Sequence, residues 1–298
     1  MKVFICYYIK DTPHGGANQF LKALRDKFAE RGMYSENPAH CDVVLFNSHH
    51  YGNELAQLKN RFNNKVFAHR VDGPMRLYND MSDQRDFIVH QLNGMANATI
   101  FQSQWSQAKS VELGFQCKAP TAVICNAPDP NIFNSEYQKK TNDKITLIAT
   151  SWSDNMRKGF RYYKFLDNNL DFSKYEFLFA GRSPVKFENI KMLGALSSKE
   201  LAKHIKSSDA FITASENDPC SNSLIEALSC GVPAIALDSG GHPEIIKDGG
   251  CLFQNYEDLM KIMEEIPYNI SSYKKNIEVD HIDDVVEKYT NFFKQLLR

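Results

Sequence analysis

The sequence predicts an α/β protein built from two Rossmann-like domains, each a parallel sheet covered by helices. Short apolar runs alternate with amphipathic helical patterns along the whole chain, which is typical of βα units. The alternation is interrupted once, by the polar and irregular segment 131–143, and then restarts. We therefore expect a first domain at residues 1–135, a second at residues 136–280 and a C-terminal helix at residues 281–298.

The first domain contains five strand-like runs and four helix-like segments. The expected strands are residues 3–8, 43–47, 65–70, 99–102 and 122–125, and the expected helices are residues 16–31, 53–63, 82–95 and 104–113. In the first of these helices the buried face is defined by apolar residues at helical spacing, namely Phe20, Leu21, Leu24 and Phe28.

The second domain repeats the alternation with six strands. They are expected at residues 145–150, 176–179, 190–193, 210–214, 234–237 and 251–253. Helices are expected at residues 159–168, 199–206, 221–229, 257–265 and 283–297.

The composition is that of an ordinary globular protein. Hydrophobic residues make up 43% of the 298 positions, charged residues 24%, and the formal net charge is −1, which does not point to nucleic acid as a partner. No apolar run approaches the roughly 18 residues of a membrane-spanning helix. The amino terminus reads as a strand rather than a signal peptide, and the seven cysteines form no CxxC pair, so we expect a reduced, cytoplasmic protein.

The most informative segment is SENDPCSNSLIEALSCGVP, residues 215–233. A strand is expected to stop at a polar turn, and a helix is expected to begin near Pro219. The helix start presents backbone N–H groups to an anion, and two carboxylates, Asp218 and Glu226, flank it eight positions apart. This arrangement suits a ligand that carries both phosphate and hydroxyl groups, such as a nucleotide-sugar. The expected N–H groups are those of Cys220, Ser221, Asn222 and Ser223.

The same segment resembles the donor-binding signature of the retaining glycosyltransferases of family 4. In that signature two glutamates stand eight positions apart, and the second precedes a Cys-Gly-x-Pro-like turn. Here Glu226 is the second acid and Asp218 stands in the place of the first. The resemblance implies the GT-B fold, two Rossmann-like domains facing a central cleft, with the nucleotide-sugar donor held by the second domain. It also implies that the last helix crosses back to the first domain.

The resemblance further implies roles for individual residues in the donor domain. Glu226 would accept hydrogen bonds from ribose hydroxyls and Asp218 would contact sugar hydroxyls, while Lys158 would neutralise the diphosphate. The family carries an arginine five residues before this lysine, where the present chain has Ser153. Arg157 or Arg182 would then supply the second positive charge.

In the first domain the resemblance points to a glycine pair and a histidine. Gly15 and Gly16 would bring the backbone close to the donor diphosphate or the acceptor, and His69 would point at the transferring sugar. His49 and His50 follow the second strand but belong to no motif.

The function expected from the resemblance is that of a retaining, metal-independent glycosyltransferase. The nine histidines form no HExxH motif and no Asp-x-Asp is present, so we expect no metal cofactor. The acceptor would be a glycan, a lipid-linked sugar or a small molecule, and a peripheral contact with the inner face of the membrane is left open. The alternatives are a catalytically degenerate GT-B subunit that only binds the sugar nucleotide, and a GT-B sugar-nucleotide epimerase.

Overall fold

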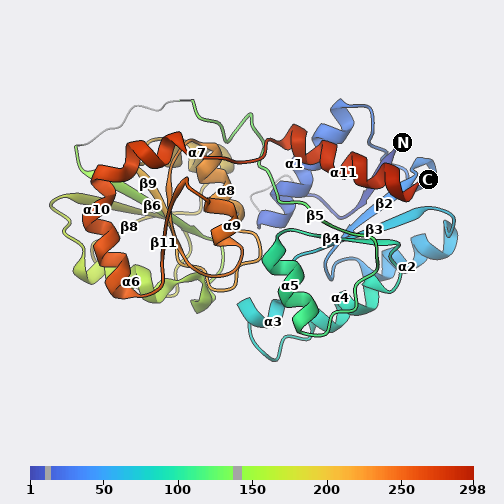
Figure 1. The fold of residues 1–298 in the computed structure, drawn as a ribbon, viewed down its shortest axis with the longest axis horizontal. Coiled ribbons are helices and arrows are strands. Elements are labelled where there is room, and N and C mark those ends of the chain that lie inside the picture. Colours follow the sequence, from blue (N-terminus) through green and yellow to red (C-terminus); the bar gives the residue numbers. More distant parts are fainter. Residues whose placement is uncertain (11–14, 137–142) are drawn as a thin grey trace. The chain divides into compact units, whose positions relative to one another are not determined.

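The computed structural model describes residues 1–10, 15–136 and 143–298 (Figure 1). The chain divides into two compact units. Unit 1 comprises residues 1–127 together with residues 280–298, and unit 2 comprises residues 128–279. Each unit is built around one parallel sheet, which confirms the α/β fold class.

Unit 1 contains a five-stranded parallel sheet in the order β1-β2-β3-β4-β5. The strands are β1 (Val3–Cys6), β2 (Val43–Asn47), β3 (Val66–Val71), β4 (Ala98–Phe101) and β5 (Thr121–Val123). Tyr34 adds an isolated parallel bridge to Val3. Because the N–H and C=O groups of Val3 both bond residues next to Tyr34, this bridge lies on the edge of β1 that faces away from β2. After β1 the chain therefore passes Tyr34 along the outer edge of β1 before it forms β2 on the other side of β1.

Helices cover both faces of this sheet. Helix α1 (Gly16–Glu30) and helix α11 (Ile282–Leu296) pack on the face that carries Leu45, whereas α2 (Gly52–Arg61) and α4 (Arg85–Asn93) pack on the face that carries Phe46. Neighbouring residues of one strand thus serve opposite faces, as the two-residue period of a strand requires. The remaining helices of the unit are η1 (Pro38–His40), α3 (Met75–Tyr78) and α5 (Gln104–Glu112).

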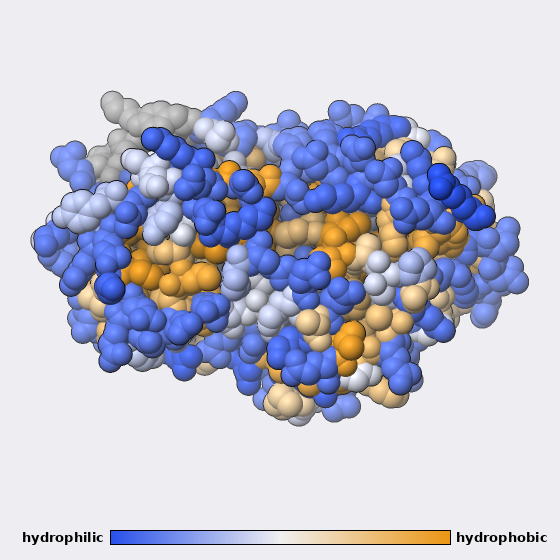
Figure 2. Space-filling view, viewed as in Figure 1, coloured by the Kyte–Doolittle hydropathy of each residue, from blue (hydrophilic) through white to orange (hydrophobic). Residues whose placement is uncertain are grey.

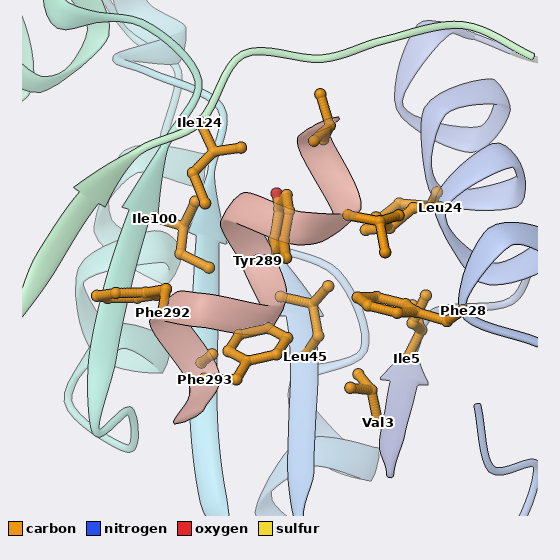
Figure 3. Close-up of a cluster of buried hydrophobic side chains, with 14 of the residues drawn as sticks. Val3, Ile5, Leu24, Phe28, Leu45, Ile100, Ile124, Tyr289, Phe292 and Phe293 are labelled. Carbon is orange, nitrogen blue, oxygen red and sulfur yellow. The ribbon is translucent and has the colours of Figure 1, made fainter. Parts of the chain in front are cut away.

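The C-terminal helix α11 completes the core of unit 1. Tyr289 and Phe293 are fully buried between the sheet and α1, beside Phe28 and Leu45 (Figure 3). The opposite side of α11 is hydrophilic in the space-filling view (Figure 2). Its amphipathic pattern, with buried residues at helical spacing, explains why this distant segment belongs to unit 1.

Unit 2 contains a six-stranded parallel sheet in the order β11-β10-β9-β6-β7-β8. The strands are β6 (Ile145–Ser151), β7 (Tyr175–Gly181), β8 (Lys191–Gly194), β9 (Ala210–Thr213), β10 (Ala234–Leu237) and β11 (Gly250–Phe253). The chain builds β7 and β8 on one side of β6, and then returns to build β9, β10 and β11 on the other side. The strand order therefore reverses between β6 and β9, and such a switch point is where ligands bind in open α/β sheets.

The helices of unit 2 also lie on both faces of their sheet. Helices α6 (Phe160–Asn169) and α10 (Tyr256–Lys275) share one hydrophobic core with the sheet. The others are η2 (Met156–Lys158), α7 (Ser198–Lys206), α8 (Asn222–Ser229) and α9 (His242–Ile246). Helix α10 runs through Pro267, although the sequence predicted an end at residue 265. Ile270 and Tyr273 pack against the core beyond the proline, and this burial offsets the lost hydrogen bond.

Candidate functional site

The carboxyl edge of the unit 2 sheet brings together three of the residues singled out in the sequence. Lys158 ends the short helix η2 that follows β6, Arg182 follows β7, and Asp218 lies in the loop after β9. Because parallel strands end at the same edge, side chains 60 positions apart in the sequence meet there. Lys158 and Asp218 stand on either side of the switch point between β6 and β9.

Lys158 and Asp218 form an ion pair, with 3.0 Å between Nζ and Oδ2. The close approach depends on Gly159, whose φ is +91°. A Cβ atom at this position would lie 2.4 Å from the Cβ of Ala214, at the end of β9. Only glycine therefore lets the start of α6 approach β9 closely enough for the pair to form.

The Asp218 carboxylate is held in its ionised form. Burial alone would raise its pKa, but the charges of Lys158 and His242 and the hydrogen bonds from Lys158 and Cys220 together lower the pKa below its ordinary value. The Cys220 N–H also donates to Oδ1 at 3.2 Å. The Asp218 side chain is 14% exposed and the Lys158 side chain 31%, so both groups can be reached from solvent.

The loop after β10 supports Asp218 from behind. The Gly241 N–H donates to the Asp218 backbone carbonyl at 2.9 Å. Gly240 has a φ of +65°, and a Cβ there would lie 2.3 Å from the same carbonyl oxygen. The loop therefore fixes Asp218 through its backbone and leaves its carboxylate facing Lys158.

His242 belongs to this support and was missed by the sequence reasoning. It is fully buried, and its Nδ1 donates to the Leu237 carbonyl at 2.9 Å. Its Nε2 is buried and has no partner among the described residues. Burial lowers the pKa of His242, although the charge of Asp218 opposes this. The only signal for it in the sequence is its place in a Gly-Gly-His-Pro-Glu segment that follows a predicted strand.

Helix α8 begins at Asn222, one residue after the start of the expected helix 221–229 and three residues after Pro219. Ser221 is the N-cap residue, and no side chain in the described part of the chain caps the first turn. The hydroxyls of Ser221 and Ser223 lie 3.4 Å apart. Because the Cys220 N–H is used by Asp218, it is not available to a ligand, which corrects the expectation for that residue. The uncapped first turn, with its aligned dipole, is suited to an anion.

Glu226 lies one turn further along α8 and is half-buried. Its carboxyl group makes no hydrogen bond or ion pair with any residue in the described part of the chain. Burial raises the pKa of Glu226 to about 8. Both oxygens of Glu226 can therefore form hydrogen bonds with a hydroxylated ligand.

Arg182 is exposed at the same edge, and its guanidinium donates to the Trp152 backbone carbonyl, with 3.1 Å from Nε. It forms no ion pair with a carboxylate in residues 1–10, 15–136 or 143–298. The positive charge of Arg182 is thus held in place by the Trp152 carbonyl and is not neutralised by a carboxylate of the described residues.

Gly15, Gly16 and His69, which were expected to act from the first domain, all lie in unit 1. His69 lies in the core of that unit. His69 stands in the middle of β3, fully buried and stacked on Phe46. Its Nε2 donates to the Ser48 carbonyl at 2.9 Å, and its Nδ1 accepts from Asn93 at 3.1 Å. Both ring nitrogens are used, so this arrangement offers none to a substrate.

Gly15 is the N-cap residue of α1, and Gly16 is the first residue of that helix. No atom of the described residues lies within 4 Å of a Cβ built on Gly15. His14, which precedes this pair, lies outside the described residues.

Two further findings concern metals and membranes. No group of three or more histidine, cysteine, aspartate or glutamate side chains in the described residues is arranged to hold a metal ion. No helix within those residues has both the length and the apolar character needed to cross a bilayer.

Comparisons with known proteins point to one family. Residues 186–277 match the family model of the group 1 glycosyl transferases. A 41.2 kDa protein from the cps region of Klebsiella pneumoniae is 31% identical over 163 residues, which are 52% of this chain and 42% of that protein. A probable sucrose-phosphate synthase of Thermosipho melanesiensis is 29% identical over 168 residues, which are 54% of this chain and 38% of that protein. The matches thus span less than half the length of these relatives.

Solved structures match over nearly the whole chain. The sucrose-phosphate synthase of Thermosynechococcus elongatus superposes on 99% of this chain and 98% of its own, with 14% identity and a TM-score of 0.77. Anabaena HepE, solved in complex with UDP, covers 99% of this chain and 100% of its own, with 16% identity and a TM-score of 0.69. At these identities the likeness establishes the fold. Residues 186–277 are thus similar to the group 1 glycosyl transferases, and the two parallel-sheet units have the GT-B fold of the matching solved structures.

Proposed function

We propose that this protein is a retaining, metal-independent glycosyltransferase that takes its sugar from a nucleotide-diphosphate donor bound by unit 2. The observation that carries the proposal is the Lys158–Asp218 ion pair at the switch point of the sheet. It provides a cation for a diphosphate and a carboxylate for a sugar hydroxyl within one hydrogen bond of each other.

The diphosphate would bind at the uncapped first turn of α8, where the helix dipole and the N–H groups near Ser221 and Ser223 favour an anion. Lys158 would turn from Asp218 toward the phosphate oxygens, and Arg182 would add a second charge. Negative charge grows on the diphosphate as the bond to the sugar breaks, and groups already oriented there stabilise that charge. This role explains why a lysine can replace a metal ion in the proposal.

The two acids would act on hydroxyl groups. Asp218 would accept hydrogen bonds from the transferred sugar, and Glu226 would bind the ribose hydroxyls of the nucleotide. We assign no covalent nucleophile, because same-face attack assisted by the leaving phosphate needs none. His69 has no part in this proposal, since its ring nitrogens are occupied in the core of unit 1.

The acceptor would be a glycan, a lipid-linked sugar or a small molecule, bound by unit 1. A cytoplasmic setting, at the inner membrane face for a lipid-linked acceptor, fits such a reaction. Anabaena HepE has been solved with UDP and with UDP-glucose, so uridine donors are the first probes to use.

The first test is the thermal shift of the full chain with UDP-, GDP-, ADP- and TDP-glucose, with and without EDTA. A donor at one hundred times its Kd adds about 2.7 kcal/mol to the free energy of unfolding, which is readily measured. We expect one nucleotide to be selected, with the same shift in EDTA. Product NMR with that donor and an acceptor panel should then show the anomeric configuration retained.

Other outcomes would redirect the assignment. Donor binding without hydrolysis or transfer to any acceptor class would favour the degenerate binding subunit, an alternative motivated by Asp218 and by Ser153 in the place of the family arginine. Conversion of the donor to an epimeric sugar nucleotide would favour the epimerase. The absence of a shift from every nucleotide would reject the proposal.

A further inference from the structure

A buried histidine adjoins the loop that supports Asp218. His242 is the first residue of α9 and follows Gly241, whose N–H donates to the Asp218 backbone carbonyl. The His242 side chain is fully buried, and its Nδ1 lies 2.9 Å from the carbonyl oxygen of Leu237. Because a carbonyl only accepts hydrogen bonds, Nδ1 carries the ring hydrogen, and in the neutral ring Nε2 is an acceptor.

The Nε2 atom of His242 is a buried polar atom with no hydrogen-bond partner in the described part of the chain. Such atoms are rare in folded proteins, because burial of an unpaired acceptor is unfavourable. The hydrogen bond to Leu237 fixes the ring but accounts for only one of its two nitrogens. Protonation would give Nε2 a hydrogen to donate and would give the ring a positive charge.

Two positive groups act on the Asp218 carboxylate. Burial raises the pKa of Asp218, but the charge of Lys158 and then that of His242, together with hydrogen bonds from Lys158 and Cys220, lower it below its ordinary value. Lys158 is in direct contact, with 3.0 Å between Nζ and Oδ2. The imidazole is thus a second source of positive charge for the same carboxylate, and it is not required while the ion pair is intact.

The same charges determine whether His242 is protonated. Burial lowers the pKa of His242 and the Lys158 ammonium also lowers it, whereas Asp218, the hydrogen bond to Leu237 and Asp238 raise it. The net effect is a pKa below the ordinary value, so the ring is neutral at pH 7 while the ion pair is intact. Loss of the ammonium would leave the two aspartates, both of which favour protonation.

The other titratable groups near His242 are few. Helix α9 packs against α8, β10 and β11. Among these elements, α8 carries Glu226, β11 carries Cys251 and β10 carries no titratable residue. Burial raises the pKa of Glu226 to about 8 and that of Cys251 to about 11, so both are uncharged at pH 6.5. Glu244, on α9 itself, is exposed to solvent. The charge of His242 therefore depends mainly on the ion pair of the candidate site.

Donor binding would change this balance. In the proposed function Lys158 turns from Asp218 toward the diphosphate, and the Asp218 side chain, only 14% exposed, loses the ammonium that it contacts. Separating a buried pair is unfavourable when the remaining charge has no compensation. A proton taken from solvent by His242 would supply that compensation, and the departing ammonium removes one of the effects that keep the ring neutral.

We propose that His242 is a positioning residue that takes up a proton at Nε2 when Lys158 leaves Asp218 for the donor diphosphate, so that Asp218 stays ionised and accepts a hydrogen bond from the sugar. The proton returns to solvent when the diphosphate leaves and the ion pair forms again. The inference rests on the proposed function for the movement of Lys158. Because binding is coupled to proton uptake, donor affinity should rise as pH falls.

The first measurement needs no donor. NMR of the ring nitrogens, with His242 assigned from its through-space contacts to Leu237, gives the pH midpoint of its protonation in the full chain. Lys158→Met removes the ammonium and keeps the length of the side chain, and its midpoint should be about one pH unit higher than that of the unmodified chain. Lys164→Met, on the outside of α6, is the matched control and should leave the midpoint unchanged.

The second measurement counts the protons bound with the donor. UDP-, GDP-, ADP- and TDP-glucose are titrated calorimetrically into the full chain at pH 6.5 in MES, Bis-Tris and imidazole, whose ionisation enthalpies differ. The unmodified chain should take up about half a proton or more per donor beyond His242→Asn, whose amide can still donate to Leu237. That difference corresponds to an affinity about threefold more sensitive to each pH unit. His40→Asn, which replaces an exposed histidine of unit 1, should behave as the unmodified chain. Glu226 is present in every variant, so its protons cancel in the difference.

Each result bears on one proposal. Equal midpoints in Lys158→Met and Lys164→Met overturn the inference, and this comparison remains decisive if His242→Asn does not fold. Donor binding with equal proton numbers in His242→Asn and His40→Asn rejects the inference alone, because a merely structural histidine would change affinity without changing the proton number. A raised midpoint in Lys158→Met with no binding of any of the four donors rejects the proposed function and retains the coupling between Lys158 and His242.

Discussion

Lys158 and Asp218, 60 positions apart, meet through a 3.0 Å ion pair at the point where the strand order of unit 2 reverses. Neither residue reaches the other through local structure. Lys158 is positioned by Gly159, which allows close contact with the end of β9. Asp218 lies in the loop that follows β9. Substitution of either residue of the pair is therefore the most direct test of the site.

Lys158→Ala should lower kcat by about 100-fold to 1,000-fold, the usual effect of losing one group that stabilises developing charge. Donor affinity should fall as well, because the variant leaves the diphosphate with fewer cations. Steady-state kinetics of donor hydrolysis or transfer, with circular dichroism as the folding check, would measure this. Lys164→Ala, on the outside of α6, removes a lysine from the same unit without touching the site. Equal turnover in the two variants would contradict the assignment.

Gly240→Ala should displace Asp218 and reduce donor binding strongly. The added Cβ would lie 2.3 Å from the Asp218 carbonyl oxygen, at a φ of +65°. Gly194→Ala is the matched control, since Gly194 has a φ of +70° and nothing within 4 Å of its Cβ position. Both variants carry the cost of a left-handed alanine, and only Gly240→Ala also meets the backbone. Isothermal titration with the selected nucleotide sugar would compare them, and equal affinities would show that the loop does not support the site.

The free energy of unfolding of unit 2 should fall as pH rises from about 4.5 to about 8. Burial raises the pKa of Glu226 from 4.5 to about 8, so the folded state holds a proton that the unfolded state has released. The loss is at most about 1.4 kcal/mol per pH unit in this window. Glu226→Gln, which cannot ionise, should lose less stability between pH 5 and pH 8. The chain has one tryptophan in each unit, so a Trp105→Phe background lets Trp152 report urea unfolding of unit 2. Parallel pH profiles for both proteins would refute the effect.

Acid should destabilise unit 1 through His69. Burial lowers the pKa of His69 from 6.5 to about 4. Between pH 6.5 and pH 4 the unfolded chain therefore binds a proton at His69, whereas the folded chain does not. This contribution is present above pH 6.5 and is lost as pH falls toward 4. His69→Gln should have a flatter profile over that range, measured by Trp105 fluorescence in a Trp152→Phe background. His49 titrates in the same direction and is retained in both proteins, so the difference between them reports His69 alone.

The sequence was sufficient for the features that depend on local pattern. The βα alternation predicted two parallel sheets, and each apolar run became a strand close to its expected bounds because a buried strand needs a continuous run of apolar residues. The spacing in residues 215–233 located the helix that carries Glu226, although the helix begins at Asn222 rather than near Pro219. A proline favours a first turn but does not require one there.

The tertiary structure decided what each side chain faces, because that depends on residues distant in the sequence. It buried His69 between Ser48 and Asn93 and left Asp72 at the edge, a distinction set by where β3 ends and by what packs on its two faces. It carried α10 through Pro267 because the core extends beyond the proline. The alternation of strands and helices is determined by local sequence. The burial of side chains, their ion pairs and the shifts of their pKa values depend on segments that are distant in the sequence and meet only in the folded structure.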